Sequence, residues 1–178
     1  KGEARATSHF VGLTDDQIHF MELPFYETGT IEKKPIGAED IQLTMDLIEK
    51  IKPHQIYAAG DLADPHGTHK VCLDAIFESV KNLKSKDFMK DCWVWLYRGA
   101  WQEWGIDEVE MAVPMSPDQV LEKRHGIFKH QSQKDGVVFQ GSDAREFWQR
   151  AEDRNKETAE LYNQLGLASY AAMEAFVR

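Results

Sequence analysis

Apolar residues recur at helical spacing in the first half of the chain, where they predict three helices. The clearest pattern covers residues 39–52, whose apolar stripe consists of Ile41, Met45, Ile48 and Ile51. Pro53 ends this helix, because proline has no N–H for a further turn. Residues 2–11 are expected to form the last turns of an earlier helix. A third helix should follow the histidines and run to about residue 84, with an apolar face of Val71, Ala75, Ile76 and Val80.

Four short apolar segments predict strands. Residues 18–23 should form the first, closed by Pro24, and residues 55–59 a short buried second one. The strongest prediction covers residues 92–97, because this segment is rich in aromatic side chains. Residues 108–113 have alternating apolar positions and predict a fourth strand.

The final third of the chain is predicted to be helical. Ser116 is a good N-cap and is followed three positions later by a glutamine, so a helix should cover residues 117–131. Asp143 starts another helix, which should break at Gly166. The mixed charges of residues 145–160 are expected to lie on a solvent-exposed helix face.

Alternating strands and helices predict an α/β fold. We expect a mostly parallel, Rossmann-like sheet with helices on both faces, in three layers, followed by a helical C-terminal third. The chain starts at Lys1 without a methionine, and residues 170–177 look like a helix still in progress. We therefore expect residues 1–178 to be one domain that lacks its N-terminal strand or strands; a processed mature chain is the alternative.

Composition narrows the classes of partner. The net charge of −9 disfavours nucleic acid and anionic membrane surfaces, because both bind basic patches. No apolar run reaches the roughly 18 residues that a membrane span needs. Cys72 and Cys92 lie inside predicted core elements, so we expect free thiols and a cytoplasmic protein.

Residues 60–69, Gly-Asp-Leu-Ala-Asp-Pro-His-Gly-Thr-His, carry most of the candidate chemistry. They join a predicted strand to a helix, which is where open α/β sheets bind ligands. His66 and His69 are three positions apart, so both rings can face one point on a helical turn. A metal ion or a developing charge is a common reason for such a pair, and Asp61 and Asp64 could orient the imidazoles.

These residues also have a structural interpretation. His69 could pack in the first helical turn, His66 could bind a backbone carbonyl, and Asp64 could be the helix N-cap. A catalytic zinc site takes three protein ligands and an open water position. The spacing alone therefore indicates an incomplete metal site.

Residues 64–76 resemble the second metal motif of the PIG-L family of N-acetylglucosaminyl de-N-acetylases, which usually reads His-Pro-Asp-His before a helix. Residues 20–24 resemble the strand and proline that precede the family's variable loop. Ile106-Asp107, Lys123 and residues 130–133 resemble its late strand, helix lysine and helix-end segment. Gly67-Thr68 replaces Pro-Asp between the histidines, and the family's first motif, His-Pro-Asp-Asp, is absent. Residues 97–104 further resemble a bacterial subgroup in which such a domain follows a glucosamine-6-phosphate deaminase/isomerase-like domain.

The resemblance implies a metal-dependent amide hydrolase for N-acetylated amino sugars. It makes His69 a zinc ligand and His66 a catalytic imidazole that stabilises the oxyanion or protonates the leaving amine; Asp64 is the second candidate catalytic residue. The candidate substrate-binding residues are Arg98, Trp101 and Trp104, because aromatic faces stack on sugars and arginine forms hydrogen bonds to phosphate. Trp as core and Arg as a surface ion pair is the competing interpretation.

Two hypotheses follow from the resemblance. In the first, the chain is the C-terminal part of a de-N-acetylase domain and is inactive alone, with zinc weakly bound or absent. In the second, it is a non-catalytic sugar-binding, regulatory or assembly module of a glucosamine-6-phosphate deaminase/isomerase. Both make an amino sugar or sugar phosphate the ligand and a deaminase-like N-terminal domain the neighbour, and both allow a homo-oligomer.

Overall fold

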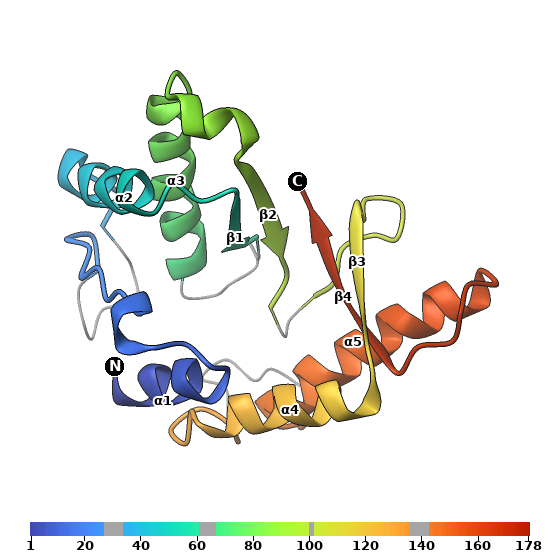
Figure 1. The fold of residues 1–178 in the computed structure, drawn as a ribbon. Helices are drawn as coiled ribbons and strands as arrows, with labels where there is room; N and C mark the ends of the chain where they lie inside the picture. Colours follow the sequence, from blue (N-terminus) through green and yellow to red (C-terminus); the bar gives the residue numbers. More distant parts are fainter. Residues whose placement is uncertain (27–33, 61–66, 100–101, 136–142) are drawn as a thin grey trace. The chain divides into compact units, whose positions relative to one another are not determined.

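The computed structural model describes residues 1–26, 34–60, 67–99, 102–135 and 143–178 (Figure 1). Contacts within the chain divide it into two units. Unit 1 consists of Lys1–Phe20 and Ala100–Ala175, and unit 2 consists of Met21–Gly99 and Phe176–Arg178.

In unit 2, helix α2 (Ala38–Ile51) packs against helix α3 (Thr68–Leu83) (Figure 1). Both confirm the predicted helices. Ile48 and Leu83 form a buried cluster with Met89 of the short 3-10 helix Asp87–Asp91. Burying such apolar side chains stabilises the unit by about 1.5–3 kcal/mol for each one.

The start of α2 is anchored by a buried carboxylate. Asp40 is 2% exposed, and its two oxygens accept hydrogen bonds from the Gly37 N–H at 2.7 Å and the Phe25 N–H at 2.9 Å. Gly37 is the N-cap of α2, and Phe25 belongs to the segment that precedes the helix. Asp40 thus ties the helix to the segment before it.

Two parallel strands of unit 2 confirm the strands predicted at residues 55–59 and 92–97, but the first is not buried as expected, since Tyr57 is 47% exposed. β1 (Gln55–Ala59) pairs with β2 (Trp93–Tyr97) in parallel. β4 (Ala172–Val177) pairs with β2 in the antiparallel direction, with Tyr97 opposite Phe176. The strand order is β1-β2-β4-β3. The fold is α/β as expected, but the four-stranded sheet is open and mixed rather than mostly parallel.

The described part of unit 1 includes the helices α1 (Gly2–Phe10), α4 (Pro117–Phe128) and α5 (Phe147–Gln164), and the 3-10 helix Asp15–Gln17. The predicted capping box at the start of α4 is confirmed. The Gln119 N–H donates to Ser116 Oγ at 3.3 Å, and Gln119 Oε1 accepts from the Ser116 N–H at 2.9 Å. α5 starts four positions later than predicted, after the N-cap Glu146.

Two strand predictions need correction. Residues 18–23 are neither helix nor strand, and Glu22 has φ +51°, a left-handed conformation that interrupts an extended segment. The later strand, β3, spans Met111–Met115 instead of residues 108–113 and includes Pro114. A proline cannot donate to a neighbouring strand, and β3 tolerates it because it is the last strand in the order and therefore an edge.

The predicted last helix is wrong: the segment forms strand β4. Its residues include good helix formers, but Ala172 and Ala175 are 0% exposed and Met173 is 4% exposed. Burial in the sheet therefore overrides local helix propensity. The predicted break at Gly166 is confirmed, because this residue has φ +80° directly after α5.

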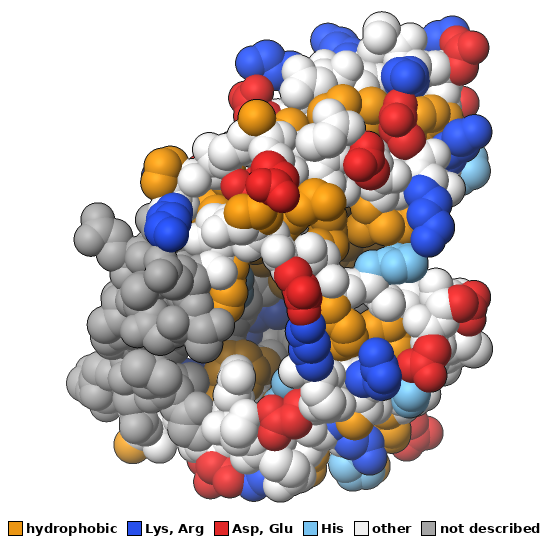
Figure 2. Space-filling model, turned by 90° about the vertical axis from the view of Figure 1, so that its left-hand side faces the viewer, with side chains coloured by type: hydrophobic (Ala, Val, Ile, Leu, Met, Phe, Trp, Pro, Cys, Tyr) orange, Lys and Arg blue, Asp and Glu red, His pale blue; other side chains and the backbone are white. Residues whose placement is uncertain are grey.

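Cys72 and Cys92 are both half-buried, and no disulfide joins them. Among the described residues, no helix combines the length and the hydropathy that a membrane crossing requires. On the face shown in Figure 2, acidic and basic side chains are interspersed with apolar ones, and neither charge gathers into one continuous field.

Candidate functional site

The carboxyl ends of β1 and β2 lie side by side in unit 2. Their register pairs Ala59 with Tyr97, and the Gly60 N–H donates to the Tyr97 carbonyl at 2.8 Å. From this edge the chain continues toward α3 on one side and into Arg98 on the other. Ligands of α/β proteins bind at such an edge, because loops from neighbouring strands converge there.

Two predicted site residues follow these strand ends. His69 is the second residue of α3, and Arg98 comes directly after β2; both are half-buried. Gly67, the N-cap of α3, has φ +66° and ψ −1°. Glycine reaches this left-handed conformation without strain, so Gly67 sets the direction in which α3 and its first turn begin.

The other predicted site residues fall elsewhere. Asp64, His66 and Trp101 lie outside the residues that the structure describes. Trp104 is half-buried and belongs to unit 1, whereas His69 and Arg98 belong to unit 2. The structure brings together the strand ends that lead to His69 and Arg98, and the roles of all these residues stay predictions.

The described residues do not by themselves fit a zinc ion. None of the groups of His, Cys, Asp and Glu in these parts of the chain has the three or more members that could hold a metal. A catalytic zinc ion takes three protein ligands and a water. His69 supplies one candidate ligand, so the zinc site stays a prediction.

A second concentration of polar side chains lies in unit 1, where α4, α5 and β4 meet. Glu174 accepts hydrogen bonds from Lys123 Nζ at 2.7 Å and from Arg154 Nη2 at 2.6 Å. The Asn155 amide donates to Glu174 Oε2 at 3.0 Å and to the Met173 carbonyl at 2.7 Å. Lys123 also donates to Asn155 Oδ1 at 2.5 Å. We call Glu103, Lys123, Arg154, Asn155 and Glu174 the ionic network.

The ionic network is largely shielded from solvent. Arg154 continues it to the loop after β2, donating from Nη1 to Glu103 Oε2 at 2.8 Å; the exposed fractions are 8% for the Arg154 side chain and 17% for Glu103. Burial alone would raise the pKa of Glu174, but the positive charges of Lys123 and Arg154 outweigh it and lower that pKa below its ordinary value of 4.5. Glu174 is therefore an ionised carboxylate held between two cations.

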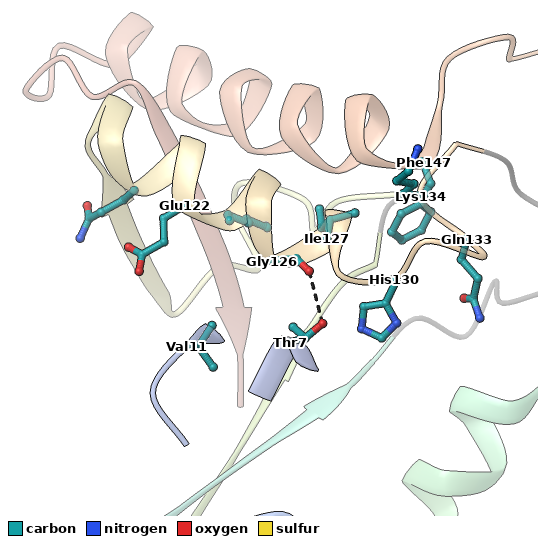
Figure 3. Close-up of a pocket in the computed structure, with 11 residues that line it drawn as sticks. Thr7, Val11, Glu122, Gly126, Ile127, His130, Gln133, Lys134 and Phe147 are labelled. Carbon is teal, nitrogen blue, oxygen red and sulfur yellow. Dashed lines mark hydrogen bonds between the residues drawn. The ribbon is translucent and has the colours of Figure 1, made fainter. Parts of the chain in front are cut away.

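A pocket of about 720 Å³ lies in unit 1 and includes Lys123 in its wall. Side chains of α1 and α4 line it, and Thr7 Oγ1 donates to the Gly126 carbonyl at 3.3 Å between these two helices (Figure 3). His130, just after α4, and Phe147, the first residue of α5, also line the pocket. The volume is typical of small-molecule sites. Unit 1 thus offers a candidate binding pocket in addition to the strand ends of unit 2.

Sequence reasoning missed the buried polar face of α5. We expected the charges of residues 145–160 on a solvent-exposed face, but Arg150, Glu152 and Arg154 are buried. The buried residues of α5 other than Glu152 recur in pairs four positions apart: Arg150, Ala151, Arg154, Asn155, Thr158 and Ala159. Small residues at this helical spacing were a signal that the stripe faces inward.

A comparison with curated proteins finds one relative that matches almost the whole chain. It is 56% identical over 179 residues to the "Putative glucosamine-6-phosphate deaminase-like protein" of Bacteroides thetaiotaomicron. The match covers 99% of this chain but spans only 27% of the length of that relative. No family model matches the chain.

The fold is similar to that of a solved structure. The conserved protein TT1542 from Thermus thermophilus superposes with a TM-score of 0.61, covering 99% of this chain and 71% of that one. The two sequences are 14% identical, so the likeness concerns the fold alone.

Proposed function

We propose that this chain is part of a longer protein that acts on amino sugars, in which it contributes to a metal-dependent de-N-acetylase domain of the PIG-L type. The observation that carries the proposal is the shared edge of β1 and β2, from which the chain leads to His69 and to Arg98. The name of the relative from Bacteroides thetaiotaomicron, a putative glucosamine-6-phosphate deaminase-like protein, supports an amino sugar as the substrate class. The chain by itself is expected to be inactive.

Each candidate residue has a distinct role in this proposal. His69 is one ligand of a zinc-type ion, and His66 and Asp64 are the catalytic residues that support the charge developing on the acetamide. Arg98 binds an anionic group of the substrate, because a guanidinium makes paired hydrogen bonds to phosphate. Trp101 and Trp104 stack on the sugar.

The decisive experiment uses the full-length protein with zinc. Acetate release is measured with N-acetylglucosamine and N-acetylglucosamine 6-phosphate. His69→Ala is expected to abolish release, whereas His54→Ala, a matched histidine before the amino end of β1, should leave it unchanged. Zinc-loaded protein that releases no acetate from either substrate would overturn the proposal.

One observation favours the second hypothesis, a non-catalytic sugar-binding module. Gly67 takes the place of the proline in the family's motif, and its φ of +66° is one that proline, fixed near −65°, cannot adopt. The backbone that enters α3 therefore differs from the one that this motif needs. Full-length protein that binds glucosamine 6-phosphate but contains no stoichiometric zinc would support this alternative.

A further inference from the structure

We propose that Glu103 is a positioning residue: it is fixed by Arg154 and Thr158 of α5 and holds Trp104 in place for contact with a sugar. This inference rests on the substrate-binding role of Trp104 in the proposed function. The inference adds a structural reason for the position of Trp104. The carboxylate of its sequence neighbour Glu103 is bound to Arg154 and Thr158, which lie more than 50 positions later in the chain.

The Glu103 carboxylate connects α5 to the backbone of Trp104. Its Oε2 atom accepts from Arg154 Nη1 at 2.8 Å and lies 3.0 Å from the Thr158 hydroxyl. Its Oε1 atom accepts from the Trp104 N–H at 3.0 Å. The Glu103 carboxylate is thus bound to α5 through Oε2 and holds the peptide N–H of Trp104 through Oε1.

These bonds are strong constraints because the helix-side partners are buried. Arg154 is 8% exposed and Thr158 is 4% exposed. A hydrogen bond between ionised groups is shorter and stronger than a neutral one, and it is stronger still away from water. Residues 102–105 form neither helix nor strand, so these side-chain bonds replace the ladder of backbone bonds that would otherwise order the segment.

Arg154 is itself held in one orientation. Its second terminal nitrogen, Nη2, donates to Glu174 Oε1 at 2.6 Å, and Glu174 is bound in turn by Lys123. The guanidinium therefore spans two carboxylates, one on β4 and one beside Trp104. The position of the tryptophan depends through these contacts on α5 and β4, the most buried elements of unit 1.

Thr158 provides the cleanest test of this arrangement. Its hydroxyl lies within hydrogen-bond distance of Glu103 Oε2, at 3.0 Å, and of the Arg154 carbonyl, at 2.9 Å. Thr158→Val removes the hydroxyl and keeps the shape, whereas Thr158→Ser keeps the hydroxyl. Glu103→Gln keeps the shape and removes the charge.

The position of Trp104 can be followed by fluorine NMR of the 178-residue chain labelled with 5-fluorotryptophan. The chain has five tryptophans, and Trp104→Phe assigns the resonance of interest. Glu103→Gln and Thr158→Val are expected to shift or broaden this resonance and to leave that of Trp148 unchanged. Thr158→Ser, which keeps the hydroxyl, should leave the Trp104 resonance as it is in the parent chain. Glu157→Gln, an exposed carboxylate of the same helix, is the matched control. A Trp104 resonance that stays unchanged in folded Thr158→Val overturns the proposal.

The second readout uses kinetics of the full-length protein on N-acetylglucosamine 6-phosphate. Thr158→Val is expected to raise KM by about threefold or more, with kcat within about twofold, because loosening a substrate contact weakens binding before chemistry. An unchanged KM in a variant whose Trp104 resonance has moved overturns the role in substrate contact. If the full-length protein releases no acetate at all, the proposed function fails, while the NMR result still decides whether Glu103 positions Trp104.

Discussion

Lys123 of α4 and Glu174 of β4 form an ion pair of 2.7 Å inside unit 1. The exposed fractions of their side chains are 33% and 19%. Glu174 also binds Arg154, so two cations share one carboxylate. If one charged side chain of such a shielded group is removed, the remaining charges lose their counter-charge. The resulting loss in the free energy of unfolding is larger than the net contribution of the intact ion pair.

Glu174→Gln is therefore expected to lower the free energy of unfolding by about 3 kcal/mol, because Lys123 and Arg154 lose their shared counter-charge. Urea unfolding followed by circular dichroism measures this loss. Glu157→Gln, on the exposed face of α5, should change it by less than about 0.5 kcal/mol and serves as the control. Equal effects of the two variants would contradict a stabilising role of the network.

Stability should fall in acid partly through Glu174. The pKa of Glu174 is lower in the folded chain than its ordinary value of 4.5 in the unfolded chain. Its contribution to the free energy of unfolding is therefore fully present above pH 4.5 and is lost as the pH falls through the lower pKa of the folded chain. We expect the free energy of unfolding to decrease below about pH 5. Glu174→Gln should show a shallower pH dependence in this range, and an unchanged slope would refute the assignment.

Asp40→Ala is expected to destabilise unit 2. The variant leaves the N–H groups of Gly37 and Phe25 without their acceptor at a site that is 2% exposed. The loss should be about 2 kcal/mol, the sum of a helix cap and a buried hydrogen bond. Hydrogen exchange of the two amides locates the effect. The exposed Asp46→Ala in the same helix is the control, and amides that stay protected in Asp40→Ala would disprove the anchor.

The strand at the end of the chain can be tested by overpacking. Ala175 of β4 is 0% exposed, so Ala175→Leu should destabilise the chain by about 1–3 kcal/mol. Ala171→Leu, just before the strand at an exposed position, should have little effect. Thermal unfolding of both variants distinguishes them, and a tolerated leucine at residue 175 would mean that this face of β4 is not enclosed.

Gly67→Pro would restore the family's residue between the two histidines. Because Gly67 has φ +66°, the change is expected to destabilise the start of α3 by about 1–3 kcal/mol. Gly67→Asn should be milder, since asparagine tolerates the left-handed region. A Gly67→Pro variant as stable as the parent chain would show that the loop can adopt the family's backbone.

The candidate site was only partly predictable from sequence. The spacing of His66 and His69 after a short strand predicted a strand-end location, and the parallel pairing of β1 and β2 agrees with that part. The ionic network was missed, because its members are scattered from Glu103 to Glu174 and share no local spacing. Charged residues on a helix are usually exposed, so only tertiary packing identifies the buried ones on α5.

By itself, the sequence determined the elements whose signals are local. The stripe of α2, the capping box at Ser116 and the break at Gly166 depend on neighbours within one or two turns, so they could be read directly. Tertiary structure alone decided that the last segment is a strand, that β3 lies at an edge and that α5 buries its charges. The physical reason is that burial and strand pairing involve residues far apart in the chain, and their free energy exceeds the few tenths of a kcal/mol by which local propensities differ.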